Sequence, residues 1–221
     1  MKNWFQGIFD LLFPEDVSCV LCKSEGDIVT GSGLCQSCYS TLPMDITGER
    51  VLSTSCFWAM EYEGIAMDLV HGLKFENKRY MARTLSFIMA KAADALFAST
   101  SFDAVCPMPI HPNRMGQRGY NQSDLIAKPI AEHMGLPYYP NLLLRIKDTR
   151  PQMELSREER LTNVKGAFAV SEEAAALKGK TLLLVDDVLT TGASTSACHS
   201  VLKENGIAMA AFCAARRYDK S

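Results

Sequence analysis

Hydrophobic and polar positions change their spacing along the chain and predict alternating strands and helices from residue 43 onward. Short apolar or aromatic runs predict strands at residues 56–62, 103–108, 168–170, 182–185 and 208–215. Apolar positions at helical spacing predict helices near residues 65–73, 80–97, 120–134 and 192–205, and Pro129 should kink or end the third of these. Such alternation is typical of βαβ units, so we expect an α/β fold with a mostly parallel sheet.

The first residues follow a different pattern. Phe5, Ile8, Phe9 and Leu12 share one face of an expected short amphipathic helix. We expect this helix to pack on the body of the protein, with contact to a membrane surface or a partner as the alternative. Polar residues interrupt it, and no small-residue cleavage site of a signal peptide follows. No run approaches the roughly 18 apolar residues of a membrane span, so no transmembrane segment is expected.

Four of the eight cysteines lie in two closely spaced pairs near the start of the chain. Cys19, Cys22, Cys35 and Cys38 form two Cys-x2-Cys pairs with twelve residues between them. Four thiolates at this spacing are typical of a structural zinc ribbon, with an iron–sulfur cluster or a redox pair as alternatives. We expect residues 1–50 to form the helix and the zinc ribbon, and residues 51–221 to form a second domain.

The other four cysteines stand alone in apolar surroundings, where thiols usually pack in the core: Cys56, Cys106, Cys198 and Cys213. Eight cysteines without an export signal are typical of a reducing compartment. We therefore expect a cytoplasmic location.

Charge is distributed unevenly along the chain, although the formal total is only −2. Residues 1–55 contain three basic and seven acidic groups, whereas residues 111–166 contain nine basic and six acidic groups. A site for a polyanion should therefore involve the second stretch. The acidic ribbon favours a structural or protein-docking role, and direct binding of duplex DNA should be weak or absent.

One junction carries most of the expected chemistry. The buried strand at Leu182–Val185 is followed by Asp186 and Asp187, then by a loop of small residues that opens into a helix at about Gly192. Consecutive backbone N–H groups at a helix start can bind an anion, and carboxylates can accept hydrogen bonds from sugar hydroxyls. The junction therefore predicts a ribose 5-phosphate site, in which Gly192 allows close approach of the phosphate. An acidic strand end followed by an ordinary capped helix is the alternative.

Residues 182–194 resemble the fingerprint with which type I phosphoribosyltransferases bind 5-phosphoribosyl 1-pyrophosphate. The chain as a whole resembles the ComF family, which joins a four-cysteine zinc ribbon to such a domain. The resemblance includes Leu73-Lys74-Phe75, the segment from Met108 through Arg118-Gly119-Tyr120-Asn121-Gln122, and the basic stretch from Arg145 to Asn163. It implies a mostly parallel sheet of the type I phosphoribosyltransferase kind, preceded by the small ribbon.

The resemblance also implies roles for individual residues. Asp186, Asp187 and Arg157 would take part in catalysis, with Arg157 in a basic hood over the diphosphate. Substrate binding is implied for Val188, Leu189, Thr190, Thr191, Gly192, Ala193, Ser194, Pro109, His111, Arg114, Arg118 and Lys74. Lys74 and Arg157 could instead be ordinary surface groups. The expected cofactors are structural Zn and Mg bound with the diphosphate substrate.

The implied reaction is transfer of the phosphoribosyl group to a nitrogen acceptor with release of pyrophosphate. The acceptor cannot be named from the sequence. The family is associated with DNA uptake in natural transformation, so a protein partner in that process is a second expectation. The alternative is a non-catalytic module that binds phosphoribosyl pyrophosphate and acts as a protein-docking factor in a DNA-uptake assembly.

Overall fold

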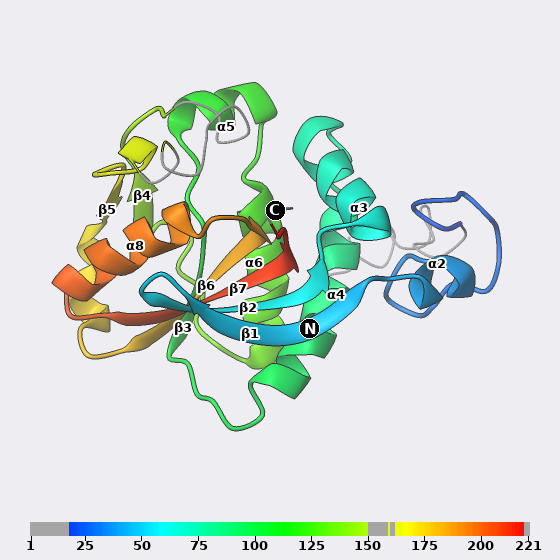
Figure 1. Cartoon of the computed structure of the whole chain (residues 1–221), viewed down its shortest axis with the longest axis horizontal. Coiled ribbons are helices and arrows are strands. Elements are labelled where there is room, and N and C mark those ends of the chain that lie inside the picture. Colours follow the sequence, from blue (N-terminus) through cyan, green and yellow to red (C-terminus); the bar gives the residue numbers. More distant parts are fainter. Residues whose placement is uncertain (1–17, 150–158, 160–161, 219–221) are drawn as a thin grey trace, which may run out of the picture.

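The computed structural model describes residues 18–149, 159 and 162–218 (Figure 1). Its main sheet has the strand order β1-β2-β7-β6-β3, formed by Met44–Val51, Thr54–Glu61, Ala208–Arg216, Thr181–Leu189 and Ala104–Pro107 respectively. The strands from β2 to β3 are parallel, and β1 pairs antiparallel with β2 at one edge. The predicted α/β fold with a mostly parallel sheet is confirmed.

Helices cover both faces of this sheet and bury it between two hydrophobic layers (Figure 1). One face packs against α3 (Gly64–Phe75), α4 (Met81–Leu96) and α6 (Gln122–Met134). The other face packs against α8 (Ala193–Glu204) and a small sheet of β4 (Leu143–Arg145) and β5 (Phe168–Val170). A short 3-10 helix, η2 (Glu172–Leu177), precedes β6.

The strand β6 shows why its segment Leu182–Val185 is apolar without interruption. Leu183 and Val185 belong to the layer under α3, α4 and α6, whereas Leu182 and Leu184 belong to the layer under α8. Successive side chains of a strand point to opposite faces, so a strand that is covered on both faces needs apolar residues at every position.

The structure differs from the sequence-based expectation at three places. β6 does not end at the acid pair but continues through it to Leu189, paired with β7. The helix α6 continues through Pro129, which is exposed, so the helical hydrogen bond that proline removes lies on the solvent side. The chain also contains β1 and a short helix, α5 (Pro112–Arg118), which hydrophobic spacing did not predict.

The cysteine-rich segment packs against α4 and contains the short helix α2 (Gln36–Ser40) (Figure 1). Tyr39 and Phe87 meet edge to face with ring centroids 6.4 Å apart. Cys19 and Leu34 are fully buried in the same hydrophobic cluster as α4. The boundary predicted at residue 50 stays a prediction, and β1, which precedes it, is hydrogen-bonded to β2 of the sheet.

No helix within the described ranges is long and apolar enough to cross a membrane. The amphipathic helix expected at the start of the chain lies outside the described residues.

Candidate functional site

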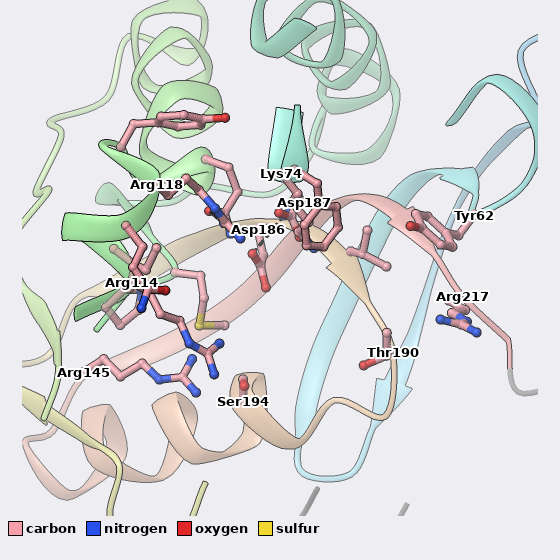
Figure 2. Close-up of a pocket in the computed structure, with 18 of the residues that line it drawn as sticks. Tyr62, Lys74, Arg114, Arg118, Arg145, Asp186, Asp187, Thr190, Ser194 and Arg217 are labelled. Carbon is pink, nitrogen blue, oxygen red and sulfur yellow. Dashed lines mark hydrogen bonds and ion pairs between the residues drawn. The ribbon is translucent and has the colours of Figure 1, made fainter. Parts of the chain in front are cut away.

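A cavity of about 740 Å³ opens where the four parallel strands end (Figure 2). Tyr62 follows β2, Met108 follows β3, Asp186–Thr190 end and follow β6, and Arg217 follows β7. In parallel α/β sheets the carboxyl ends of the strands are the usual place for a ligand. The topology therefore brings residues far apart in the sequence to one site.

The acid pair forms the floor of this cavity. Lys74, in the last turn of α3, makes an ion pair with the Asp187 Oδ1 at 2.7 Å, and the Ser123 hydroxyl donates to the Asp186 Oδ1 at 2.8 Å. The Asp187 side chain is only 3% exposed, and its Oδ2 is buried without a hydrogen-bond partner in the described part of the chain. A buried unpartnered carboxylate oxygen is costly unless a ligand donates to it.

Burial shifts the pKa values of Asp186 and Lys74 in opposite directions. Burial and the neighbouring Asp187 raise the pKa of Asp186 to about 7. Burial alone would lower the pKa of Lys74, but the charges of Asp187 and Asp186 outweigh burial and raise it. Lys74 is therefore charged at neutral pH.

The loop between β6 and α8 is held by the strands beside it. Arg216 donates a hydrogen bond to the Thr190 carbonyl oxygen, and the Arg217 backbone N–H donates to the Leu189 carbonyl oxygen at 2.9 Å. Gly192 is the N-cap of α8 with φ of 75°. These contacts fix the loop in place without a ligand, so the backbone is already arranged to present N–H groups at the start of α8.

Gly192 is also required here for a contact within the fold that the sequence did not predict. A Cβ at this position would lie 2.5 Å from the Val51 Cγ1, at the end of β1. The glycine therefore makes room for the β1–β2 hairpin. Next to this contact, the Ser53 hydroxyl lies 3.1 Å from the His199 Nδ1 and 3.3 Å from the Ser196 hydroxyl, so the hairpin tip also contacts the helix α8.

Three arginines line the opposite side of the cavity from Tyr62 and Arg217 (Figure 2). Arg114 donates to the Thr149 carbonyl oxygen at 2.7 Å, Arg145 donates to the Thr149 hydroxyl, and Arg118 donates to the Gln122 side chain. Within the described part of the chain, no ion pair joins any of the three to a carboxylate. Burial and the neighbouring Arg114 lower the pKa of Arg145. Cations held close together without a counter-charge favour an anionic ligand.

The structure brings most of the predicted site residues to the cavity. Nine of them line it: Lys74, Pro109, Arg114, Arg118, Asp186, Asp187, Val188, Thr190 and Ser194. Five do not: His111, Leu189, Thr191, Gly192 and Ala193. His111 instead caps α5, where its Nδ1 accepts from the Asn113 backbone N–H at 3.2 Å. Arg157 and most of the expected hood lie outside the described residues. The roles of all these residues stay predictions.

Sequence reasoning did not assign several lining residues to the site. These are Tyr62, Phe75, Asn77, Gln117, Tyr120, Gln122 and Arg217. Met108, Ile110 and Arg145 also line the cavity, and they lie in segments that the resemblance assigned to the diphosphate. The signal for Tyr62 and Arg217 was positional, because each directly follows a parallel strand. Using that signal requires knowing that β2 and β7 are neighbours in the sheet.

The four paired cysteines form a separate site that fits a zinc ion. Their Sγ atoms all lie within 4.8 Å of one another, and the Sγ atoms of Cys22 and Cys35 are 3.6 Å apart. Sulfur atoms placed tetrahedrally at about 2.3 Å from zinc are about 3.8 Å apart, which agrees with this cluster. Hydrogen bonds from Ser24 lower the pKa of Cys22 to about 6, which favours the thiolate that binds metal.

The four unpaired cysteines are core residues, as predicted. Cys56, Cys106, Cys198 and Cys213 are all 0% exposed. Burial raises the pKa of Cys106 to about 12, so its thiol stays protonated and inert.

Sequence comparison identifies relatives with competence-related names. Competence protein F of Haemophilus influenzae is 30% identical over 142 residues, which cover 63% of this chain and 62% of that protein. DNA utilization protein YhgH of Salmonella typhimurium is 32% identical over 143 residues, with the same coverage. Competence protein ComFC of Streptococcus pneumoniae is 26% identical over 210 residues, which cover 89% of this chain and 86% of that protein. The names of these relatives support the resemblance to the ComF family.

Two limits apply to these similarities. The aligned segment spans less than two thirds of Competence protein F and of DNA utilization protein YhgH. No protein-family model matches the chain. What the chain binds and transforms must therefore be argued from its own residues.

Solved structures with a related chain path include adenine phosphoribosyltransferases. The enzyme of Leishmania tarentolae has a TM-score of 0.45 and 10% identity, covering 78% of this chain and 95% of that one. The enzyme of Saccharomyces cerevisiae has a TM-score of 0.42 and 13% identity, covering 66% of this chain and 73% of that one. Similarity at this level carries no argument about what the chain does.

Proposed function

We propose that this chain binds 5-phosphoribosyl 1-pyrophosphate together with Mg²⁺ and transfers its phosphoribosyl group to a nitrogen acceptor. One observation carries the proposal: a buried acid pair, a loop at a helix start and three arginines that make no ion pair with a carboxylate among the described residues converge on one cavity. These are the three kinds of group that a ribose with two separate phosphate ends requires.

The acid pair would hold the ribose. Asp187 lines the cavity with a buried Oδ2 that has no partner among the described residues, and a ribose hydroxyl is a donor of the right kind. Ser123 orients Asp186 through its hydroxyl hydrogen bond. The 5-phosphate would then lie at the loop from Thr190 to Ser194, which follows the acid pair in the chain.

The diphosphate would lie on the side of Arg114, Arg118 and Arg145. Guanidinium groups bind phosphate oxygens in pairs and keep their charge when buried. In the proposed reaction the acceptor nitrogen forms a bond to the anomeric carbon, and the bond from that carbon to the diphosphate oxygen breaks. The bonding electrons leave with pyrophosphate, and the nitrogen releases its proton to solvent. The arginines would stabilise the charge that develops on the leaving group.

The residues of the cavity fit Mg²⁺ as a companion of the substrate. Carboxylate oxygens are the ligands that Mg²⁺ prefers, and it usually keeps waters and binds substrate phosphates. Asp186 and Asp187 supply the carboxylates, although Lys74 already occupies one oxygen of Asp187. When bound, Mg²⁺ would supply neutralisation of the diphosphate charge.

The acceptor would occupy the side of Tyr62 and Arg217, which lies away from the three arginines (Figure 2). Phe75 also lines the cavity and is 54% exposed. An open acceptor side also supports the second candidate, a module that binds phosphoribosyl pyrophosphate without turnover. In either form, the names of the relatives support a role linked to DNA uptake.

Calorimetry with three ligands tests the binding proposal. Wild type should bind phosphoribosyl pyrophosphate with Mg²⁺ and, more weakly, ribose 5-phosphate. The double change Asp186→Asn and Asp187→Asn should weaken both ligands by about ten- to a hundredfold for each lost charged hydrogen bond. Arg114→Gln should weaken only the diphosphate ligand.

The matched control is Asp103→Asn, because Asp103 lies before β3 at the opposite end of the sheet and pairs with Lys180. It should change neither affinity. Absence of heat from wild type with phosphoribosyl pyrophosphate and Mg²⁺ would refute the proposal. Release of pyrophosphate in a panel of nitrogen bases separates transfer from binding alone.

A further inference from the structure

The ammonium group of Lys74 is held in a fixed position beside the acid pair. Lys74 comes from the last turn of α3, and its ammonium group lies 2.7 Å from the Asp187 Oδ1. The side chain of Lys74 is 22% exposed, and that of Asp187 is 3% exposed. The position of the ammonium is fixed by α3, because the Tyr120 hydroxyl donates to the Leu73 carbonyl oxygen and joins that turn to the start of α6.

Basic residues outnumber acidic ones among the described residues that line the cavity. These residues include five basic ones (Lys74, Arg114, Arg118, Arg145 and Arg217) and two acidic ones (Asp186 and Asp187). With all seven ionised the formal charge is +3, and protonation of Asp186 would make it more positive. An anion is attracted to such a cavity, whereas a free divalent cation is repelled.

We propose that Lys74 is a built-in counter-cation that keeps free divalent metal ions away from Asp186 and Asp187. Two adjacent buried carboxylates would otherwise attract a divalent cation strongly. Lys74 supplies a compensating positive charge without blocking the second oxygen of Asp187, which remains available to a hydrogen-bond donor. Metal then enters the site only with a ligand that carries its own negative charge. This inference rests on the proposed function for the identity of that ligand, but not for the exclusion of free metal.

A purely structural role for the ion pair makes a different prediction. If Lys74 only stabilised the fold, its removal would weaken the protein and would create no new binding. If Lys74 excludes metal, its removal should create a cation site that wild type lacks. A gain of binding cannot result from misfolding, so the two roles are separable.

The experiment is a titration with Mn²⁺ in the absence of any phosphoribosyl ligand, at pH 8, followed by calorimetry and by the electron paramagnetic resonance signal of free Mn²⁺. The protein is first loaded with zinc, so that the four cysteines do not bind Mn²⁺. The variant Asp187→Asn shows whether any bound Mn²⁺ lies at the acid pair. Wild type should show no binding that depends on Asp187. Lys74→Met should bind Mn²⁺ at least about tenfold more tightly, because one adjacent unit charge has been removed.

Two matched variants sharpen the comparison. Lys74→Arg keeps the charge and should behave as wild type, and Lys203→Met removes an exposed lysine in the last turn of α8 and should also behave as wild type. Adding Asp187→Asn to Lys74→Met should abolish the gained binding. Lys74→Gln replaces the methionine variant if that one fails to fold.

The inference is overturned if wild type binds Mn²⁺ and Asp187→Asn abolishes that binding. Free metal would then reach the acid pair although Lys74 is present. It is also overturned if a folded Lys74→Met or Lys74→Gln variant binds no better than wild type. Neither result depends on phosphoribosyl pyrophosphate, whose binding to wild type is measured separately and tests the proposed function alone.

Discussion

Val51 and Gly192 touch across the junction between the β1–β2 hairpin and the loop that precedes α8. A Cβ at Gly192 would lie 2.5 Å from the Val51 Cγ1, and the φ of Gly192 is 75°. A glycine is needed here both for the backbone conformation and for the close approach of a side chain from another part of the chain.

Gly192→Ala should therefore destabilise the protein and displace the loop. The left-handed conformation costs an alanine about 1–2 kcal/mol, and the contact with Val51 adds to that cost. Urea unfolding should show the loss, and calorimetry should show weaker binding of ribose 5-phosphate. Adding Val51→Ala should restore part of the stability by removing the collision, although the backbone strain remains. If the double variant were less stable than Gly192→Ala by the full cost of Val51→Ala alone, the two residues would be independent.

Asp186 should make stability depend on pH. Its pKa rises from 3.8 to about 7, so between these values the folded protein holds a proton that the unfolded chain has released. The free energy of unfolding should therefore fall as pH rises through this window. Asp186→Asn removes this contribution. Urea unfolding from pH 5.5 to 7.5 measures the free energy of unfolding of wild type and of the variant. As pH rises, the stability of wild type should fall relative to that of the variant. A constant difference would contradict the raised pKa.

The zinc site predicts one bound zinc ion per chain. Cys38→Ser should release it, because three thiolates and a hydroxyl bind zinc much more weakly than four thiolates. Because Cys19 and Leu34 share a hydrophobic cluster with α4, the loss of metal should also weaken packing against that helix. Elemental analysis and thermal unfolding measure the two effects. Cys106→Ser is the control, since it should lower stability and keep the zinc. If the purified protein were coloured and contained iron, the zinc assignment would be wrong and the four cysteines would bind an iron–sulfur cluster.

Binding of duplex DNA should be weak and should fall steeply with salt. The formal net charge of the chain is −2, and the first 55 residues carry more acidic than basic groups. Fluorescence anisotropy with a labelled duplex at low and at physiological salt measures the dependence. Nanomolar affinity of the isolated protein at physiological salt would contradict this prediction.

The sequence predicted well those elements whose pattern of apolar residues is complete within the element itself. The uninterrupted apolar run of β6 and the helical spacing of α4 each follow from neighbours in the sequence. β1 was missed because it is an edge strand, mostly exposed, and shows no alternation of apolar and polar residues. α5 was missed because it has only seven residues, none of them buried.

The site was predictable to the extent that one segment carries it. Asp186, Asp187 and the loop after them are contiguous, so their chemistry could be read along the chain. Tyr62 and Arg217 come from β2 and β7, and only the order of strands in the sheet brings them to the same cavity. The contact of Val51 with Gly192 joins residues more than a hundred positions apart, and no local pattern encodes it.

The strand β1 begins four residues after α2 ends and finishes at Val51, so one continuous segment runs from the cysteine-rich part of the chain to the loop before α8. A shortened chain that starts after residue 50 would discard this strand along with the ribbon. It would leave β2 as a new open edge, prone to pair with other chains, and would detach Val51 from the strand that places it against Gly192. Separating the two parts for expression therefore requires a cut before Met44, so that the edge strand stays with the sheet.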